Sequence, residues 1–584
     1  MPSFNLLTSA WLPVLEPDGV FREAGLSEAL ERAHELRLAV RPGSMEHAAL
    51  LRLLMAVYDA ACGPADRREW AAAWTSATFD LVRVRAYAER WRDRFDLFDP
   101  VRPVFQAGGI TEFGRKQTAL LPEYLGSDIG LLFNQGKLTS AAPLPAGAAA
   151  RHLLVRLAFD VAGIKGGIAG GRTYGAKVGH LGSVTHLSLR EAAAPTIKSE
   201  LLLNLPPQPR TPADRPIWEE DADLPLTPGA ERPVSGRLAW WTWPSRLMRL
   251  EADADGGVVG LAWHDGLRPV LDSDLFALAR AHDPVTGWRS ENGRRLPVGD
   301  AYGYVQPWVA AQVLPSGSAV VEHVSRAVRE GVVAPGLLLH AVLSCPTYNR
   351  HMSVMTGDPG GVALLGPAGL VADPEGALLL AAAGRFAGRV PGAVQTVTGN
   401  VGPGVTPPDA RNLVLPSLDD AWYDLAASLG EARARVVVGS LIEDDDASDA
   451  IEAWRAIVLE MASGLVDSQV HGSVTTKAKV RAQVGAYLRS LPMVEAPEAG
   501  QNGPEAGDVK PRPRARKSAG SGQRRGRPAV LYEAFGSSKS LEDWLADPEC
   551  EVGRSTLWKR LRAGEDMATA LKGRRSGRIG PVRE

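Results

Sequence analysis

The sequence predicts an α+β protein with a mixed N-terminal globular domain of short strands and helices, a C-terminal helical bundle, a basic linker and a small helix-turn-helix domain. Short apolar runs broken by Pro and Gly fill much of the N-terminal part, as is typical of short strands and loops. Between residues 417 and 490, apolar residues instead recur at helical spacing. At 584 residues the chain is too long for one core, so we expect several domains.

The N-terminal part is predicted to begin with a hairpin. Residues 4–14 and 20–26 have the composition of strands, and Glu16-Pro-Asp-Gly19 between them has the composition of a turn. Ser27 is expected to cap the helix that follows. Helices are predicted at 27–36, 45–61, 70–91 and 151–162, and strands at 238–243 and 257–263. A buried strand is predicted at 337–343, with a turn of helix as the alternative.

Three helices are predicted in the C-terminal third. Ser417 and Asp420 resemble a capping box ahead of a helix that ends at Val438, and Ser448 is expected to open the next. The third helix, 475–490, is basic. The second helix carries one apolar stripe, Ile451, Trp454, Val458, Met461 and Leu465. The predicted domains are therefore 1–412, the bundle 413–495, the linker 496–529 and the helix-turn-helix domain 530–573.

The charge of the chain is unevenly distributed. Residues 510–584 contain 18 basic and 9 acidic residues, a charge of +9, whereas the rest of the chain carries −11. A basic tail on an acidic body suggests an appendage that seeks nucleic acid.

Cys62, Cys345 and Cys550 form no C-x-x-C pair, which argues against a disulfide framework or a structural zinc site and fits a reducing cytoplasm. We find no apolar run of membrane-spanning length and no signal peptide, and expect a cytoplasmic protein.

One stretch, Gly163–Gly179, contains seven glycines among Lys165, Arg172 and Lys177. It offers bare backbone N–H groups and close approach to an anionic partner. A flexible surface loop explains it about equally well. It lacks the Gly-Lys-Ser/Thr ending of a P-loop and the G-x-G-x-x-G spacing of a dinucleotide fold. A contact of its backbone with nucleic acid remains as a hypothesis.

The tail contains two possible DNA-binding elements. Arg525-Gly-Arg-Pro528, with Arg525 and Arg527, matches the core of an AT-hook, although solvated linker fits equally well. Ser540 is expected to start a helix, and 553–562 resembles a recognition helix. Its groove-facing residues would be Arg554, Ser555, Thr556 and Lys559. The alternative is that Trp544 and Trp558 anchor this unit on a protein partner.

Catalytic signatures are sparse. The dipeptides His264-Asp265 and His282-Asp283 suggest an HD-type metal phosphohydrolase, but a turn at the following Gly or Pro explains them more simply. The sequence has no H-E-x-x-H, no nucleophile elbow, and 11 histidines scattered singly. We therefore expect no enzymatic activity, no metal and no cofactor.

Four motifs occur in a set order. The first two are Phe4-Asn-Leu-Leu-Thr-Ser-Ala-Trp-Leu-Pro-Val14 and Leu132-Phe-Asn-Gln135, and the next two are the segment Ala158–Gly171 and Leu201-Leu-Leu-Asn-Leu205. In content, order and spacing they are similar to motifs of the CasA family, the large subunits of the type I-E Cascade complex that searches DNA with a CRISPR RNA guide. The resemblance covers roughly residues 1–492. The tail has no counterpart in it.

The resemblance implies that the chain reads a protospacer-adjacent motif (PAM) in duplex DNA and helps to open the duplex, while base pairing with the guide reads the rest. Gly170, Gly171 and Arg172 would form the glycine loop at the PAM, and His351, Met352 and Ser353 the tip of a wedge. Met352 departs from the glutamine frequent in the family. Arg289 is our choice for a basic finger, with Arg294 and Arg295 as alternates. Leu132, Phe133, Asn134, Gln135 and Lys137 would contact the guide RNA and a neighbouring subunit.

The implied partners are the CRISPR guide RNA, double-stranded target DNA, a helicase-nuclease, and the backbone, small and 5′-handle-binding subunits of Cascade, with no membrane. A second hypothesis is a sequence-specific DNA-binding regulator directed by the helix-turn-helix. The HD-type hydrolase is a distant third. Neighbouring genes for Cascade subunits would separate the first two hypotheses, and phosphodiesterase activity with Mn²⁺ would support the third.

Overall fold

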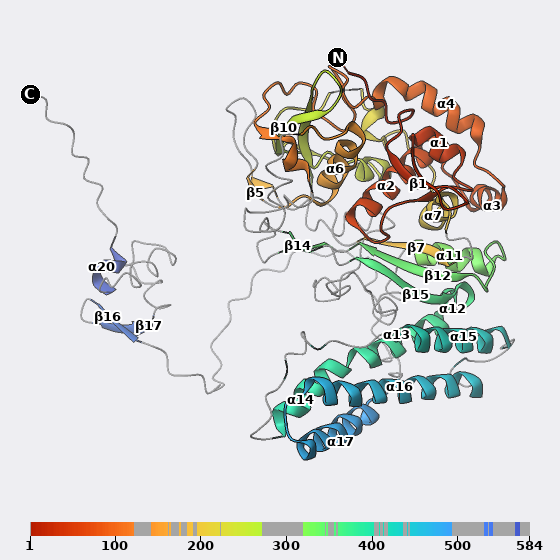
Figure 1. The fold of residues 1–584 in the computed structure, drawn as a ribbon, viewed down its shortest axis with the longest axis vertical. Coiled ribbons are helices and arrows are strands. Elements are labelled where there is room, and N and C mark those ends of the chain that lie inside the picture. Colours follow the sequence, from red (N-terminus) through yellow and green to blue (C-terminus); the bar gives the residue numbers. More distant parts are fainter. Residues whose placement is uncertain are drawn as a thin grey trace, which may run out of the picture. The chain divides into compact units, whose positions relative to one another are not determined.

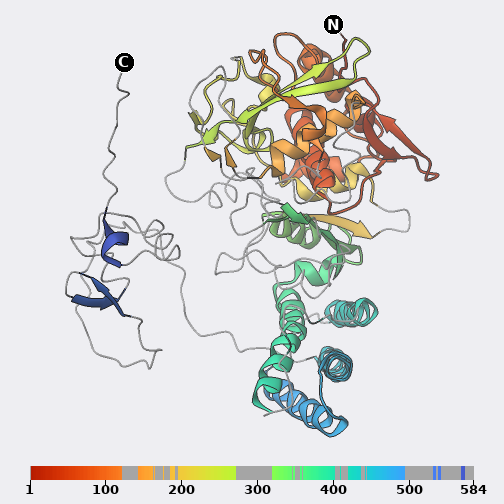
Figure 2. The same ribbon diagram turned by 60° about the vertical axis from the view of Figure 1, so that its left-hand side comes forward.

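The computed structural model describes most of the chain in two compact units, Met1–Glu498 and Ala499–Glu584, and we treat each unit by itself. The longer described segments are 2–121, 142–161, 195–270 without 222, 319–344, 360–401, 418–435 and 444–492. The shorter ones are 163–164, 175–176, 184–190, 346–348, 355–357, 408, 413, 441, 531–534, 537–540 and 567–572. The mixture of helices and strands confirms the α+β class (Figures 1 and 2).

The predicted N-terminal hairpin is present but shorter than expected. Strand β1 (Leu12–Leu15) pairs antiparallel with β2 (Phe21–Ala24) and with β3 (Arg37–Leu38). Residues before Trp11 form turns because the carbonyl of Asn5 accepts the N–H groups of Thr8 and Ser9. The indole of Trp11 donates to the carbonyl of Leu6 at 2.8 Å, which fixes this turn against the core.

The first helices follow the apolar pattern, but two predicted boundaries are wrong. Helix α1 (Leu26–Glu31) begins after Gly25 without a side-chain cap, so Ser27 is not its cap. Helix α2 (Met45–Cys62) is confirmed and is capped by Ser44, whose hydroxyl accepts the N–H of His47. The single helix predicted at 70–91 is two helices, α3 (Arg67–Thr75) and α4 (Leu81–Trp91). The break occurs because Asp80 caps a new helix by accepting the N–H of Arg83.

A second small sheet lies beside helix α6 (Ala146–Phe159). Strand β10 (Val258–Asp265) pairs with β9 (Arg246–Ala252) and β4 (Arg115–Lys116). The run predicted as a strand at 238–243 is instead helix α8 (Arg237–Trp241). Its first turn is capped from outside, because the carboxylate of Asp214 accepts the N–H groups of Leu238 and Ala239. Further short elements are η1 (Arg92–Phe95), η2 (Gln117–Leu120), η5 (Ile217–Glu219), β8 (Glu231–Arg232) and β11 (Arg268–Pro269).

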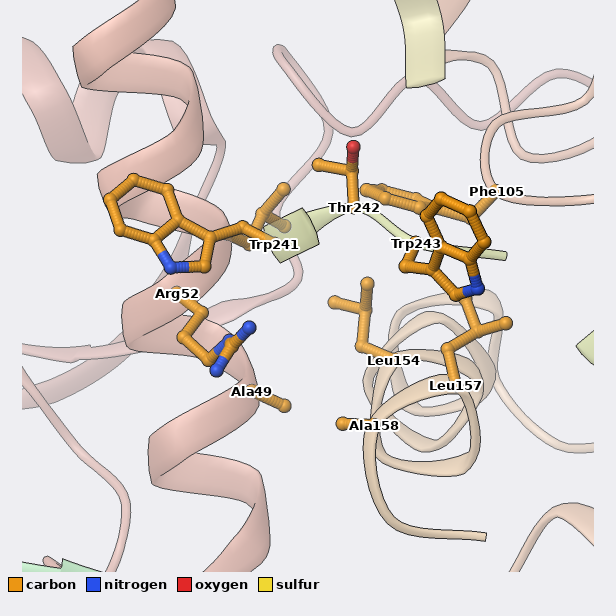
Figure 3. Close-up of a pocket in the computed structure, with 10 residues that line it drawn as sticks. Ala49, Arg52, Phe105, Leu154, Leu157, Ala158, Trp241, Thr242 and Trp243 are labelled. Atoms are coloured by element: carbon orange, nitrogen blue, oxygen red, sulfur yellow. The ribbon is translucent and has the colours of Figure 1, made fainter. Parts of the chain in front are cut away.

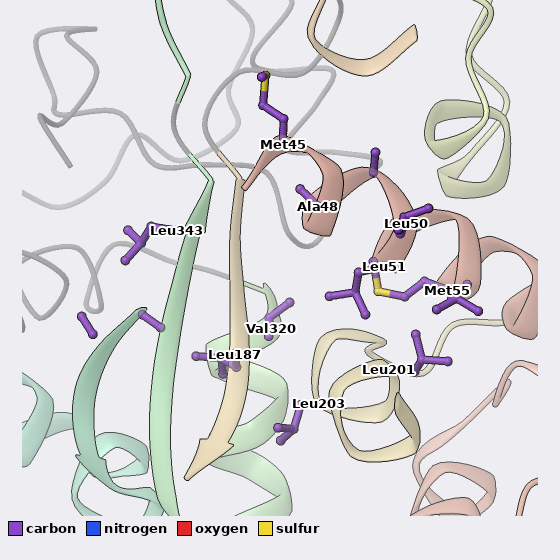
Figure 4. Close-up of a cluster of buried hydrophobic side chains, with 14 of the residues drawn as sticks. Met45, Ala48, Leu50, Leu51, Met55, Leu187, Leu201, Leu203, Val320 and Leu343 are labelled. Carbon is purple, nitrogen blue, oxygen red and sulfur yellow. The ribbon is translucent and has the colours of Figure 1, made fainter. Parts of the chain in front are cut away.

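A three-stranded antiparallel sheet occupies the middle of the first unit (Figure 1). Its central strand is β12 (Leu338–Ser344), which confirms the strand predicted at 337–343, with β7 (Val184–Arg190) and β15 (Gly361–Pro367) on its two sides. Figure 4 shows side chains of α2 and of α7 (Ile197–Asn204) packed together beside β7. Helices α11 (Ala319–Arg329) and α12 (Ala368–Ala372) add to the same core.

The helices after α12 form a bundle, which Figure 2 shows end-on in part. They are α13 (Pro374–Gly388), α14 (Val390–Asn400), α15 (Asp419–Arg435), α16 (Asp445–Gln469) and α17 (Val474–Ser490). The stripe predicted on α16 is buried at Trp454, Val458, Met461 and Leu465 and half-buried at Ile451. Helix α16 is capped by Asp444, not by the expected Ser448, because the Asp444 carboxylate accepts the N–H of Ala447.

Helices α13 and α14 together make one run, Pro374–Asn400, that is long and apolar enough to cross a membrane by length and composition. This corrects the expectation that no such run occurs. In its most apolar stretch, 67% is buried inside the protein, as is typical of a helix in a protein core. Helices α2 and α3 pass the same test only as a pair, and they are bent by 113°.

The second unit contains an antiparallel hairpin of β16 (Leu531–Ala534) and β17 (Ser537–Ser540), and helix α20 (Met567–Leu571). The sequence patterns do not predict this hairpin. Ser540, expected to start a helix, is the last residue of β17. The predicted recognition helix at 553–562 lies outside the described residues, so the helix-turn-helix stays a prediction.

Candidate nucleic-acid interface

All the predicted contact residues lie outside the described part of the chain. They are Gly170, Gly171, Arg172, Arg289 with its alternates Arg294 and Arg295, His351, Met352, Ser353, Leu132, Phe133, Asn134, Gln135, Lys137, Arg525, Arg527, Arg554, Ser555, Thr556 and Lys559. The structure does describe where several of these segments leave the core. We refer to those described positions as the roots of the segments.

The root of the glycine loop is a pair of short antiparallel strands. Strand β5 (Gly163–Ile164) pairs with β6 (Gly175–Ala176), and Gly163 lies opposite Ala176. The ten residues 165–174 between them include Gly170, Gly171 and Arg172. The two ends of this segment are therefore held together by backbone pairing.

The wedge has a root of the same kind. Strand β13 (Thr347–Tyr348) pairs antiparallel with β14 (Met355–Gly357), and Tyr348 lies opposite Met355. The segment 349–354 between them contains the predicted tip residues. Since β13 follows β12 and β14 precedes β15, this small hairpin continues the connection between two strands of the central sheet.

The chain connections from the two roots meet the central sheet at the same end. In the β7–β12 pair, Val184 lies opposite Ser344, so the start of β7 meets the end of β12. In the β12–β15 pair, Leu343 lies opposite Gly361, so the start of β15 meets the same end. Three adjacent strand ends therefore meet here. The start of β7 follows the glycine loop, the end of β12 precedes the wedge hairpin, and the start of β15 follows that hairpin.

The start of helix α2 braces this end of the sheet. A guanidinium nitrogen of Arg41 donates to the carbonyl of Gly360 at 2.6 Å, and the hydroxyl of Ser344 donates to the carbonyl of Ser44 at 3.3 Å. Gly43 has a φ of +77°, and a Cβ at this position would lie 2.4 Å from the nitrogen of Gly361. Only glycine allows the backbones to come this close.

A group of buried polar side chains lies where α2, β7 and α7 meet. Nε2 of His47 is 4.0 Å from Oε1 of Glu200, and the Ser188 hydroxyl donates to the same oxygen at 3.0 Å. The rings of His47 and His186 meet edge to face with centroids 6.1 Å apart. Burial raises the pKa of Glu200 to about 7, lowers the pKa of His47 to about 4, and lowers that of His186 well below its usual value. Sequence reasoning did not identify this group.

One interior cavity among the described residues is too small for an organic ligand. The cavity between α2 and α6, which Figure 3 shows lined by Arg52, Leu154, Trp241 and Trp243, has a volume of about 30 Å³. That is room for about one water molecule. Among the described residues, no three His, Cys, Asp or Glu side chains are grouped so as to hold a metal ion. His264-Asp265 ends strand β10, and no turn follows it, because the N–H groups of Gly266 and Leu267 continue the pairing by donating to the carbonyls of Ser245 and Pro244. His282-Asp283 lies outside the described residues.

Comparison with known proteins identifies the family. A family model described as CRISPR-associated protein Cse1 matches residues 5–326, more than half of the chain. The chain belongs to the Cse1 family. The CRISPR-associated protein CasA/Cse1 of Thermus thermophilus is 34% identical to this Cse1 chain over 282 residues, which are 46% of the chain and 53% of that protein. The matched region thus spans about half the length of this curated relative. The predicted CasA resemblance is confirmed.

Solved Cse1 structures share the fold. The structure of Thermus thermophilus CasA (Cse1) matches 84% of this chain and 100% of its own, at 25% identity and a TM-score of 0.63. Thermobifida fusca Cse1 matches 85% of this chain and 99% of its own, at 24% identity and a TM-score of 0.65. A chain of a CRISPR RNA-guided surveillance complex matches 84% of this chain and 100% of its own, at 18% identity and a TM-score of 0.56. The last two likenesses show the fold alone.

Proposed function

We propose that this Cse1 chain is the non-catalytic large subunit of a type I-E Cascade surveillance complex, where it recognises the PAM in double-stranded target DNA and helps to open the duplex. The observation that carries the proposal is the shared sheet end. Val184 and Ser344 lie opposite each other there, so the chain enters β7 from the glycine loop and leaves β12 for the wedge hairpin at neighbouring positions. A reader of the PAM and a wedge that parts the next base pairs must act within a few base pairs of each other, and this arrangement allows it.

The partners we propose follow from the same role. They are the CRISPR guide RNA, the other Cascade subunits, the target duplex and a helicase-nuclease recruited after opening, all in the cytoplasm. One matched structure is a chain of a CRISPR RNA-guided surveillance complex, which supports the placement of this chain in such an assembly. Residues 132–137 are the proposed contact with the guide and its neighbouring subunit. The tail is proposed to bind duplex DNA independently.

The experiment reconstitutes the chain with its guide RNA and partner subunits and measures binding of duplexes with and without a PAM. Gly170→Ala and Gly171→Ala should weaken binding of the PAM duplex at least about tenfold while assembly is kept, because a methyl group would collide with the floor of the groove. Asn134→Ala with Lys137→Ala should instead release the large subunit at moderate salt. Gly464→Ala in α16 is the matched control, since a Cβ there meets nothing within 4 Å. Unchanged PAM binding by both glycine variants would reject the proposal.

A further inference from the structure

Three buried charged side chains form a continuous network between α6 and the start of β9. Arg156, Asp160 and Arg246 are 1%, 0% and 2% exposed as side chains. The guanidinium of Arg156 lies 3.3 Å from one carboxylate oxygen of Asp160, and Nε of Arg246 donates to the other at 2.5 Å. One carboxylate therefore joins two guanidinium groups in the interior of the first unit.

Arg156 holds the backbone just before residues 122–141. It donates to the carbonyls of Ala119 and Leu121 at 2.7 Å each and of Leu120 at 3.3 Å. Its guanidinium also lies 4.9 Å from the ring centroid of Trp263. Leu121 is the last described residue before the segment that contains the predicted guide-contact loop. One side chain thus fixes three successive carbonyls at the root of that segment.

Arg246 holds the backbone just before the glycine loop. It donates to the carbonyl of Val161 at 3.0 Å and to that of Ser245 at 2.7 Å. Val161 stands two residues before β5, the first strand of the glycine-loop root. The roots of the two predicted contact loops are therefore linked through the bonds of Asp160 to both arginines.

Stability alone does not account for this arrangement. Burying ionised groups carries a large desolvation cost, and apolar residues of similar volume often serve stability as well or better. Only arginine presents several donors in a rigid planar fork, so only arginine can bind three carbonyls and a carboxylate at once. What the network supplies beyond packing is a fixed direction for the backbone at both roots.

We propose that Arg156, Asp160 and Arg246 are positioning residues that hold the roots of the guide-contact loop and of the glycine loop, at Leu121 and Val161, in one fixed relative geometry. The inference rests on the proposed function of those loops. Because both roots share one network, a displacement at either root is transmitted to the other. Loss of the network should therefore impair guide-dependent assembly and PAM discrimination together.

The test uses the full-length chain, reconstituted with guide RNA and the other subunits, and compares Arg156→Lys and Arg246→Lys. Both keep the positive charge and lose the fork. Each should lower the ratio of PAM to non-PAM duplex affinity about tenfold or more, and should also weaken retention in the assembly. A purely structural role would lower the melting temperature without changing that ratio.

Arg237→Lys is the matched control. Arg237 binds both carboxylate oxygens of Asp59 at 2.6 and 2.7 Å and the carbonyl of Pro206, with side-chain exposures of 5% and 8% in the ion pair. It should lose comparable thermal stability and keep both PAM discrimination and assembly. If Arg156→Lys does not fold, Arg246→Lys, which leaves the three carbonyl bonds of Arg156 in place, decides the outcome.

The glycine and Asn134/Lys137 variants separate the two possible failures. If those loop variants lose binding while Arg156→Lys and Arg246→Lys behave like Arg237→Lys, the proposed function stands and the positioning role is rejected. If the loop variants have no effect, the proposed function fails and takes this inference with it. Joint loss of discrimination and retention in the two network variants, against an unaffected control, supports it.

Discussion

Nε2 of His47 lies 4.0 Å from Oε1 of Glu200, and both side chains are buried where α2 and α7 pack against β7. Burial acts on the two groups in opposite directions. It raises the pKa of Glu200 to about 7 and lowers the pKa of His47 to about 4, so both are mostly neutral in the folded protein between about pH 5 and pH 6. His186, next to His47, has its pKa lowered by the same cause.

Glu200→Gln should change how stability depends on pH. The folded-state pKa of Glu200 lies above its unfolded value, so its contribution is fully present below about pH 4.5 and is lost as pH rises through about 7. The glutamine side chain cannot ionise. Between pH 5 and pH 8, the free energy of unfolding of the variant should therefore rise relative to that of the natural protein by up to about 3 kcal/mol. Denaturant unfolding at both pH values measures this. Glu460→Gln, on the exposed face of α16, is the control. Parallel pH profiles for Glu200→Gln and the natural chain would contradict the prediction.

The buried histidines change the dependence of stability on pH in the opposite direction. The pKa values of His47 and His323 are lowered by burial to about 4, so the stability they contribute is present above about pH 6.5 and is lost as pH falls toward 4. Both the natural chain and Glu200→Gln should therefore lose stability below pH 6.5.

Gly43→Ala should destabilise the sheet end that braces the wedge root. The alanine would have to adopt a φ of +77° and would bring its Cβ within 2.4 Å of the Gly361 nitrogen and 2.7 Å of the Leu343 carbonyl. Gly19→Ala is the matched control, because its φ is +86° and nothing lies within 4 Å. The free energy of unfolding should fall by about 1 kcal/mol in the control, because of backbone strain, and by about 2 kcal/mol more in Gly43→Ala. Equal losses in thermal unfolding would show that the close approach has no energetic weight.

The fold could be predicted wherever a local pattern decides the structure. The stripe through Trp454 and Val458 gives one buried face at helical spacing, and α16 follows it. Prediction failed where a distant group decides. Helix α8 was expected to be a strand, since its cap is the carboxylate of Asp214, more than twenty residues earlier.

The candidate site shows the same division. The loops could be proposed from their sequence motifs, but the network that roots them could not. Its only signal is one arginine, Arg156, inside the apolar run Leu153–Phe159. Most of its partners are backbone carbonyls, which have no signature in the sequence. Strand register likewise brought Val184 to Ser344 across 160 residues of chain.

Changing His351, Met352 and Ser353 to glycine should spare initial duplex contact and slow strand opening. An apolar or bulky side chain between base pairs opposes their restacking, and glycine cannot replace it. A fluorescent base beside the PAM reports the rate of opening. A duplex with its first base pairs already mismatched is the control, and it should restore the rate. Normal opening of the fully paired duplex by the variant would rule out the wedge.

The tail should bind duplex DNA by itself. Its charge of +9, the Arg525-Gly-Arg-Pro528 sequence and the basic segment Arg554–Arg562 support this hypothesis. Neutralised phosphates release counterions, so residues 509–584 alone should lose affinity at least about tenfold between roughly 50 and 200 mM salt. Arg554→Ala with Lys559→Ala should remove any sequence preference, whereas Arg525→Ala with Arg527→Ala should weaken all duplexes equally.

Deletion of the tail from the full chain separates its role from that of the body. Guide-directed recognition should continue without it, but the search for targets should slow, because sliding and hopping on non-specific DNA depend on phosphate contacts. Association rates on long and short target DNA measure this, and the tail should accelerate binding to long DNA only. The competing interpretation is that Trp544 and Trp558 dock on a protein. A gel shift with no duplex binding even at low salt would favour that interpretation, since electrostatic attraction is strongest there.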